Sequence, residues 1–425
     1  MTGLKTAARV LRHQAGHLRS LVTRGRPAVF PSFTAMTLDE DDMALAEDWS
    51  ARPEAWNDPE PVREFERAFA AWNGSGHARA FLGGRVALSA CIDALELGPG
   101  AEVIVPGYTC VVVPNAFDFA GVKVVYADIE LETYGPDATA VESKITDRTR
   151  AVLIQHLYGL VCRDYEAILD LARRRRLFVI EDCAHATGAE YRGVRVGNRG
   201  HMGFISTEQS KVFTTIQGGV AITGDPALAR RLDAYAERAP FPEAERTRRL
   251  LQAVPLNYMR SKSPDRWWRA DYAMLRFGRD ELVSTTPQEE RGERPAHYGR
   301  RMPAPLASIG RNQLRKLDFY NRVRRGHAAR WHAWCGERGL PEAHVIEDSV
   351  PVFLRYPTRV ERERKRDRRW ARREIGVELG VWYVSAVHPV NRPVKDCPRA
   401  MEAVATCVNL PTLLGERYGD GGIGE

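Results

Sequence analysis

The feature that most constrains this chain is an alternation of short apolar strands with amphipathic helices between residues 62 and 225. Six runs are rich in β-branched residues and bounded by turn residues, at 102–107, 123–128, 151–159, 177–182, 201–206 and 219–225. Helical patterns precede the first run, at 62–74 and 85–98, and others separate later runs, at 111–120 and 164–175. Nearly continuous apolar strands that alternate with helices predict an α/β fold, whose mostly parallel central sheet lies between helices.

The alternation stops after residue 225. Residues 240–300 are rich in Arg, Pro and Trp, which predicts an irregular insertion with short helices. The apolar spacing of residues 306–334 predicts one long amphipathic helix. Strand-like pieces and a helical pattern follow it, at 349–357, 360–375, 381–389 and 407–411. This last part predicts a smaller C-terminal α+β domain.

Four regions are therefore expected along the 425 residues. They are a basic N-terminal arm (1–38), a large α/β domain (39–239), the insertion with a following loop (240–300), and the long helix with the small C-terminal domain (301–425). A chain of this length is long enough for two domains with such additions.

The basic arm has two competing interpretations. Residues 1–38 carry six Lys/Arg residues and no acid, and their apolar residues recur at roughly helical spacing. Such a segment either packs on the body of the protein or lies as a peripheral contact on an anionic membrane surface. We favour packing, because the apolar stripe lacks Trp or Phe to insert into lipid; an organellar transit peptide is a weaker third interpretation.

Charge and cysteine content limit the partners. The formal net charge of +7 favours anionic partners such as phosphorylated substrates. The run 361–374 mixes both signs with few aromatics, which predicts a solvated helix face and no nucleic-acid binding. Seven scattered cysteines without a C-x-x-C pair disfavour a disulfide framework or a metal site and favour the reducing cytoplasm. No uncharged apolar run approaches the roughly 18 residues that span a bilayer.

Three features fall where the predicted strands end or the helices begin. Gly83 and Gly84 directly precede a helix, a place where backbone N–H groups can approach an anion. Asp182 ends an apolar strand, and Lys211 stands in a polar stretch with Glu208 as its charged neighbour. Taken singly, these features are explained by a turn, a helix cap or ion pair, and a solvated lysine. Ligands of parallel sheets bind beyond the carboxyl ends of the strands, where Asp182 and Ser206 lie.

Together the three features are the parts of a pyridoxal 5'-phosphate (PLP) site. A lysine forms a Schiff base with the aldehyde, a carboxylate keeps the pyridine nitrogen protonated, and a glycine-containing helix start anchors the phosphate.

Several motifs resemble those of the DegT–StrS sugar aminotransferases. They include "GGRVALSACIDALELGPGAEVIVPGYTC", "HLYGL", "VIEDCAHATGAEYRGVRVGNRG", "FISTEQSK", "GGVAITGD" and "RNQLRKLDFYNRVRR". The resemblance runs from about residue 62 to 412, with residues 240–296 unmatched. It implies a PLP-dependent transferase of fold type I that acts as a homodimer, with its site near the subunit boundary.

The resemblance also implies roles for single residues. Lys211 matches the Schiff-base lysine, Asp182 the partner of the pyridine nitrogen, and His185 the residue at the ring hydroxyl. Ala184 belongs to the same motif. Ser206 is expected to bind the phosphate together with the backbone at the start of the helix that follows Gly83, at Gly84, Arg85 and Val86.

Two positions depart from the family pattern. The residue that matches Cys110 is often an aromatic ring stacked on the cofactor, so the stack in this chain must come from elsewhere, with Tyr108 and His185 as candidates. Gly299 replaces an asparagine that reaches the phosphate of the partner subunit, and a neighbouring arginine is expected to replace it, either Arg300 or Arg301. Substrate contacts are expected at His156 and Tyr158 of the "HLYGL" motif.

The implied function is transfer of an amino group from glutamate or glutamine to a nucleotide-linked keto-sugar, in amino-sugar, polysaccharide or glycosylated natural-product biosynthesis. Dehydration of a sugar is disfavoured, because that chemistry usually replaces the lysine with histidine, and Lys211 is present. A non-sugar substrate stays open, since the insertion can reshape the pocket. A non-catalytic relative is disfavoured by the presence of Asp182, Ser206 and Lys211 together.

Overall fold

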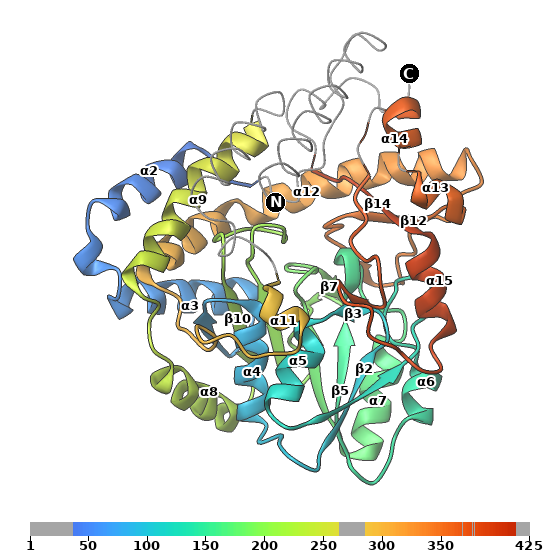
Figure 1. Cartoon of the computed structure of the whole chain (residues 1–425), viewed down its shortest axis with the longest axis horizontal. Helices are drawn as coiled ribbons and strands as arrows, with labels where there is room; N and C mark the ends of the chain where they lie inside the picture. The colour runs from blue at the N-terminus through green and yellow to red at the C-terminus, as the bar shows by residue number, and fades with distance from the viewer. Residues whose placement is uncertain (1–36, 263–284, 368, 376, 378, 414–425) are drawn as a thin grey trace.

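The computed structural model describes residues 37–262, 285–367, 369–375, 377 and 379–413 (Figure 1). The expectations for the basic arm up to residue 36, including its membrane contact, lie outside the described residues. So do those for residues 263–284 of the insertion and for the last twelve residues, 414–425.

A seven-stranded sheet forms the centre of the molecule, in the order β1-β10-β9-β6-β5-β2-β4. Its strands are β1 (His77–Phe81), β2 (Glu102–Pro106), β4 (Lys123–Ala127), β5 (Thr149–Gln155), β6 (Phe178–Asp182), β9 (Met202–Ser206) and β10 (Gly219–Thr223). Strand β10 is antiparallel to both of its neighbours, and the pairs from β9 through β4 are all parallel. The mostly parallel sheet predicted from the sequence is confirmed.

Both faces of the sheet are apolar because successive strand side chains point to opposite sides. On β5, Val152 and Ile154 belong to one buried cluster, and Ala151 and Leu153 belong to another. The first cluster includes residues of α2 (Glu40–Ser50), α3 (Pro59–Asn73), α7 (Tyr165–Arg175) and α12 (Ala304–Gly336). The second includes residues of α4 (Gly84–Ala94), α5 (Val112–Phe119) and α8 (Pro226–Arg238). The predicted α/β architecture, with helices on both faces, is confirmed.

Helix α12 connects this sheet domain to the C-terminal part of the chain. It has 33 residues, and Figure 1 shows it as an orange helix crossing the upper part of the molecule toward the red C-terminal elements. Those elements are β11 (Ser349–Val350), β12 (Tyr356–Arg359), α13 (Arg362–Arg366), α14 (Arg369–Glu374), β13 (Val387–His388), α15 (Pro398–Thr406) and β14 (Cys407–Leu410). The helix predicted over 360–375 is thus two short helices.

Two C-terminal strands pair with short strands of the sheet domain. Strand β11 pairs with β7 (Glu190–Tyr191), which forms a small sheet with β8 (Val194–Arg195). Strand β13 pairs in parallel with β3 (Thr109–Cys110). These pairings place the segment around β13 next to Cys110, where the site lies. The remaining short elements are η1 (Pro53–Ala55), α6 (Ala138–Ser143), η2 (Leu157–Gly159) and α11 (Pro287–Glu290).

The described part of the insertion is more regular than its composition predicts. Residues Ala244–Lys262 form one helix of 19 residues, α9, with Pro255 inside it. The prediction of short helices alone was wrong here, because an apolar stripe that includes Leu250, Leu251 and Val254 is buried in the core beneath the arginines. None of the helices among the described residues combines the length and the hydropathy needed to cross a membrane.

Candidate active site

One cavity lies at the carboxyl ends of β6 and β9 and over the start of helix α4. It brings together most of the residues that the sequence predicted for a cofactor site: Gly84, Arg85, Val86, Cys110, Asp182, Ala184, His185, Ser206 and Lys211. This is the edge of a parallel sheet at which ligands bind in such folds.

Lys211 lies on the loop between β9 and β10, with its amine held among rings. Its Nζ is 3.0 Å from Nε2 of His185 and 5.1 Å from the ring centroid of Trp382. The loop is closed by backbone hydrogen bonds from Thr207 N to Gly218 O and from Thr215 N to Thr207 O. Lys211 therefore sits on a hydrogen-bonded loop that directs its amine into the cavity.

The Lys211 loop is also tied to the long helix. The guanidinium of Arg324, fully buried on α12, donates to the carbonyl oxygen of Val212 at 2.6 Å. Burial, followed by the charge of Arg355, lowers the pKa of Arg324 to about 9. A buried charge-assisted hydrogen bond of this kind restricts the backbone next to Lys211.

Asp182, the last residue of β6, is buried at the bottom of the cavity. Its Oδ1 accepts a hydrogen bond from the amide of Ala184 at 3.0 Å. Burial raises its pKa to about 6, against the opposing effects of that amide and of the Lys211 charge. A buried carboxylate with so little compensation favours a cationic partner, such as a protonated ring nitrogen.

The start of α4 lies very close to the end of β9 and the start of β10. A Cβ atom at Gly84 would lie 2.8 Å from Cβ of Ser206, and one at Gly219 would lie 2.4 Å from the nitrogen of Gly84. Glycine is therefore required at both positions. The helix N-terminus and the Ser206 hydroxyl form a cradle that suits an anion. Of the two amides predicted to hold the phosphate with Gly84, that of Val86 already donates to the Gly83 oxygen at 3.0 Å.

His185 is neutral in this environment. Burial, and then the charges of Lys211 and Arg355, lower the pKa of its imidazole well below the usual range. Its Nδ1 is 3.5 Å from the amide of Tyr158, which leaves Nε2 directed at Lys211. A neutral imidazole can accept a proton or a hydrogen bond next to the lysine amine.

The insertion lines part of the same cavity, in agreement with the expectation that it can reshape the pocket. Arg246 of α9 donates to Oε1 of Gln217 at 2.8 Å, and His297 and Tyr298 lie nearby on the cavity wall. Glu289 of α11 forms an ion pair with Arg85. Burial alone would raise the pKa of Glu289, but Arg85 holds it below its usual value. No local motif pointed to Arg246 or Glu289, because they meet the sheet only through the fold; His297 and Tyr298 belong to the same loop as Gly299, which the family resemblance had singled out.

Two tyrosines predicted for the site are core residues. The hydroxyls of Tyr108 and Tyr158 lie 3.0 Å apart, and both side chains are fully buried outside the cavity lining. Tyr158 has no exposed surface for a substrate contact, and Tyr108 cannot lie on a ring in the cavity. Both predictions are corrected accordingly.

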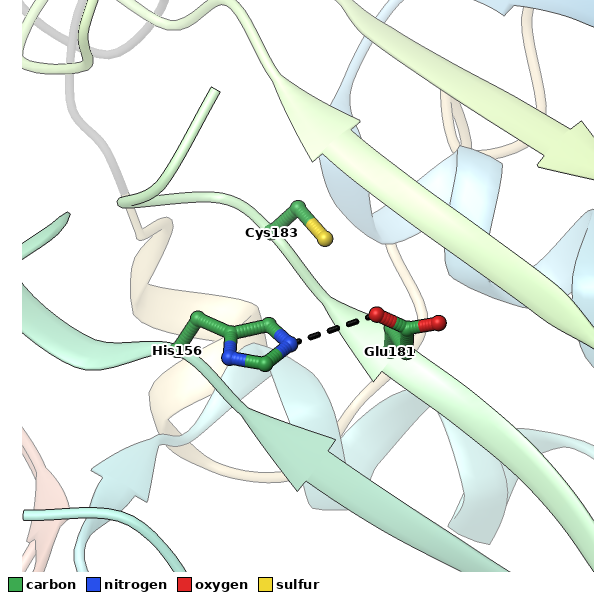
Figure 2. A group of neighbouring side chains, drawn as sticks. All are labelled: His156, Glu181 and Cys183. Atoms are coloured by element: carbon green, nitrogen blue, oxygen red, sulfur yellow. Dashed lines mark hydrogen bonds and ion pairs between the residues drawn. The ribbon is translucent and has the colours of Figure 1, made fainter. Parts of the chain in front are cut away.

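His156, predicted to contact substrate, lines the cavity, and both of its ring nitrogens are already bound within the protein; Figure 2 shows its pair with Glu181. The substrate contact stays a prediction. The Nδ1 of His156 accepts from the amide of Cys162 at 3.2 Å, so Nε2 carries the proton and donates to Glu181 at 3.2 Å. Figure 2 also shows Cys183 beside this pair, and the three side chains are of metal-ligating types. Glu181 already accepts from Tyr165 Oη and from the amides of Gly197, Arg199 and Gly200, so the group is a hydrogen-bonded structural node.

Arg300 and Arg301 do not line the cavity of their own chain. Arg300 forms an ion pair with Glu243, and Arg301 donates to the carbonyl of Ala236 and lies over the ring of Phe241. Within one subunit, therefore, neither guanidinium reaches the cradle. Their expected contact with the phosphate of a partner subunit stays a prediction.

The donor set of the cavity fits PLP. Three groups surround the cavity: an amine, a buried carboxylate, and a helix start at which two glycines allow a close approach of the backbone. Each of them matches one functional group of that cofactor. The fit rests on Lys211, Asp182 and the cradle of Gly84 and Ser206.

Comparison with known proteins agrees with this reading. The model of the DegT/DnrJ/EryC1/StrS aminotransferase family matches residues 37–415. A "GDP-perosamine synthase" of Caulobacter vibrioides is 42% identical over 171 residues, which are 40% of this chain and 46% of that protein. An "L-glutamine:2-deoxy-scyllo-inosose aminotransferase" of Streptomyces kanamyceticus is 37% identical over 226 residues, 51% of this chain and 53% of that protein.

In each case the match spans about half the length of the curated relative. Among solved structures, S. venezuelae DesV in complex with a ketimine intermediate has a TM-score of 0.66 and 28% sequence identity. That match covers 89% of this chain and 92% of the DesV chain, so the similarity includes both the sheet domain and the C-terminal part.

Proposed function

Because this chain belongs to the DegT/DnrJ/EryC1/StrS aminotransferase family, we propose that it is a PLP-dependent aminotransferase that moves an amino group from glutamate or glutamine to a nucleotide-linked keto-sugar. The observation that carries the proposal is the shared cavity of Lys211, Asp182 and the cradle of Gly84 and Ser206. The names of two relatives support the substrate classes, since one contains a GDP-linked compound and the other names L-glutamine.

PLP, when bound, supplies an electron-accepting ring that stabilises negative charge on the carbon that loses a proton. Lys211 would hold the cofactor covalently and, once released by substrate, move the proton at that carbon with its Nζ. Asp182 would keep a proton on the ring nitrogen, which suits a carboxylate buried without another strong cation beside it. Neutral His185, 3.0 Å from the lysine amine, would orient that amine.

The phosphate of the cofactor would bind at the start of α4 with the Ser206 hydroxyl. The substrate would enter past the insertion, where Arg246 places a positive charge on the cavity wall. A cation there and the surplus of +7 suit a substrate that carries a diphosphate. The buried ring of His185 and the partly buried ring of Trp382 at Lys211 would limit the access of water to the reacting carbon.

Visible absorption tests the cofactor assignment. The purified protein, given PLP, is expected to develop a visible band, and borohydride reduction followed by peptide mapping should place the label on Lys211. A label on another lysine, or no band at all, contradicts the assignment.

A two-step assay tests the reaction. L-Glutamine or L-glutamate alone should convert the bound cofactor to its amine form, with loss of the visible band. A panel of keto-sugar nucleotides should then restore the band, and the member that does so identifies the acceptor. Failure of every amino donor to change the spectrum of a protein that binds PLP argues against transamination.

We further propose a homodimer and a reducing, cytoplasmic environment. All seven cysteines are free, and six of them are buried, so folding requires no oxidation. The loop that carries Arg300 and Arg301 lies at the edge of the cavity region and remains the candidate for contact with a partner. Light scattering should give twice the mass of 47.8 kDa, and an active species of a single chain contradicts the dimer.

A further inference from the structure

We propose that Tyr383, from the C-terminal part of the chain, supplies the aromatic surface against which the cofactor ring lies. The inference rests on the proposed PLP chemistry and deepens it by assigning a ring-binding residue that neither the sequence motifs nor the comparisons assign.

A planar ring held between Asp182 and Lys211 needs a flat apolar surface to exclude water from its face. Cys110 lines this part of the cavity, but a thiol is small and offers no flat surface. Burial raises the pKa of the Cys110 thiol, so the side chain behaves as a small neutral group. The space above Cys110 must therefore be filled by another side chain.

Strand pairing brings Tyr383 to that space. In the parallel pair of β13 and β3, Val387 is opposite Thr109 and His388 is opposite Cys110. The pairing is extended by hydrogen bonds from Thr109 N to Ala386 O at 2.8 Å and from Val111 N to His388 O at 2.7 Å. The segment before β13 thereby reaches the cavity, and its Tyr383, only 3% exposed, lines it together with Asp182 and Lys211.

Neighbouring rings hold the Tyr383 ring in a defined orientation. Tyr108 meets it edge to face with centroids 4.7 Å apart, and His388 does so at 5.6 Å. His185 lies nearly parallel to it, with an interplanar angle of 23° and centroids 6.5 Å apart. Tyr108, which the sequence offered as the stacking ring, thus supports the ring that lines the cavity. A side chain packed in this way presents a rigid surface.

The phenol of Tyr383 also belongs to the site electrostatically. Burial, and then the proximity of Cys110 and Asp182, raise its pKa well above the usual value. The hydroxyl therefore stays neutral and adds no negative charge next to Asp182, so it does not compete with that carboxylate for a cationic ring nitrogen.

The other aromatic candidates among the described lining residues are engaged elsewhere. The His185 ring contacts the Lys211 amine, and the Tyr298 hydroxyl lies near Ser89 Oγ and the Arg85 oxygen at the cradle end. Phe204 is part of the core cluster on the α4 side of the sheet. His156 is held through both ring nitrogens by Cys162 and Glu181, and His297 lies on the insertion. Tyr383 remains as the lining ring that lies close to both Cys110 and Asp182.

Cys110 and Tyr383 then form one wall of the cavity, in which the small Cys110 side chain leaves space for the large Tyr383 ring. A large ring at position 110 should overpack this wall in the natural chain, yet it should replace the lost surface when residue 383 is small. The two positions should therefore show strong coupling in a double-mutant cycle.

The experiment measures PLP affinity of the apoprotein by equilibrium dialysis, together with circular dichroism of the visible band. Tyr383→Phe keeps the ring and should bind PLP within about twofold of the natural protein. Tyr383→Ala should raise the dissociation constant about tenfold and weaken the visible circular dichroism. The double variant Tyr383→Ala/Cys110→Phe should recover most of the affinity. Tyr320→Ala, a tyrosine truncation on α12 outside the cavity lining, is the matched control and should leave PLP affinity unchanged.

Each outcome separates the inference from the proposed function. A natural protein that binds no PLP overturns the proposed function itself. A natural protein and a Tyr383→Ala variant with equal affinity and equal visible circular dichroism overturn the role of Tyr383. If the alanine variant does not fold, Tyr383→Leu takes its place, because leucine keeps apolar volume without a flat ring, and natural affinity in that variant likewise overturns the inference.

Discussion

Glu181 and Asp182 are neighbours at the end of strand β6, yet they face different regions of the molecule. Because strand side chains alternate, Glu181 enters the core between β6 and α7, and Asp182 enters the cavity. The core region surrounds its carboxylate with hydrogen-bond donors, and the cavity leaves its carboxylate with few. The comparison shows how one strand can stabilise the fold with one acid and prepare a binding site with the next.

The pKa values of the two acids shift in opposite directions. Burial alone would raise the pKa of Glu181, but hydrogen bonds from His156, Tyr165 and the Gly197 amide hold it below its usual value. Burial raises the pKa of Asp182 to about 6, because one backbone amide and the Lys211 charge do not offset it. Donors of the protein itself fill the hydrogen-bonding capacity of Glu181, whereas Asp182 would be stabilised by a cationic ligand.

Asp182 therefore makes the ligand-free protein less stable at neutral pH. Its carboxyl holds a proton in the folded state up to about pH 6, whereas the unfolded chain releases it near pH 3.8. The folded state binds more protons between these values, so stability falls as the pH rises through this window and stays lower above it. The shift corresponds to about 3 kcal/mol above pH 6.

The largest expected effect is a loss of activity from a substitution in the cavity that leaves the core around Glu181 unchanged. Lys211→Ala removes the amine that carries the cofactor and moves the proton, so kcat should fall by about 10⁴-fold. The melting temperature of the apoprotein at neutral pH should fall only slightly, because the Glu181 hydrogen bonds are untouched and Asp182 loses just the Lys211 charge that opposes the rise in its pKa. Residual turnover within tenfold of the natural protein would show that another group performs the proton transfer.

Asp182→Asn separates function from stability, because it should lower kcat and raise the free energy of unfolding of the apoprotein. Loss of the carboxylate removes the partner of the ring nitrogen, and kcat should fall about 10²- to 10³-fold. Urea unfolding of the apoprotein at pH 8 should show a gain of up to about 3 kcal/mol, which shrinks toward pH 5 as the natural carboxyl regains its proton. Near-normal turnover, or a stability gain that does not depend on pH, contradicts this account.

Glu181→Gln should have the opposite pattern. The amide cannot accept all the hydrogen bonds that reach the carboxylate, so the free energy of unfolding should fall by about 3 kcal/mol. PLP affinity, measured by dialysis under conditions where the variant is folded, should stay within about twofold. A loss of PLP affinity without a loss of stability would place Glu181 in the binding site.

Tyr165→Phe tests the same core region with the smallest change. It removes one hydroxyl, which donates to Glu181 at 2.6 Å, and should lower the free energy of unfolding by about 2 kcal/mol. Cofactor binding and kcat should be unaffected. Urea titration measures the effect, and a double-mutant cycle with Glu181→Gln should show that the two losses are not additive.

The α/β fold and most residues of the cavity could be predicted from the amino-acid sequence. Both are recorded locally: strands and helices have their own periods, and Gly84, Asp182, Ser206 and Lys211 each follow or precede an element whose end can be located. Parallel strands bring such ends to one edge of the sheet. That rule is enough to predict that distant residues such as Gly84 and Lys211 meet.

The three-dimensional contacts determine which side chains at this edge of the sheet can reach a ligand in the cavity. His156, Tyr108 and Tyr158 lie at the predicted edge, yet their polar atoms are bound within the core. Conversely, Tyr383 and Arg246 reach the cavity from segments without a local motif. The physical reason is that hydrogen-bond pairing and ring packing depend on contacts between residues far apart in sequence, such as β13 with β3, and these contacts leave no periodic signal in the chain.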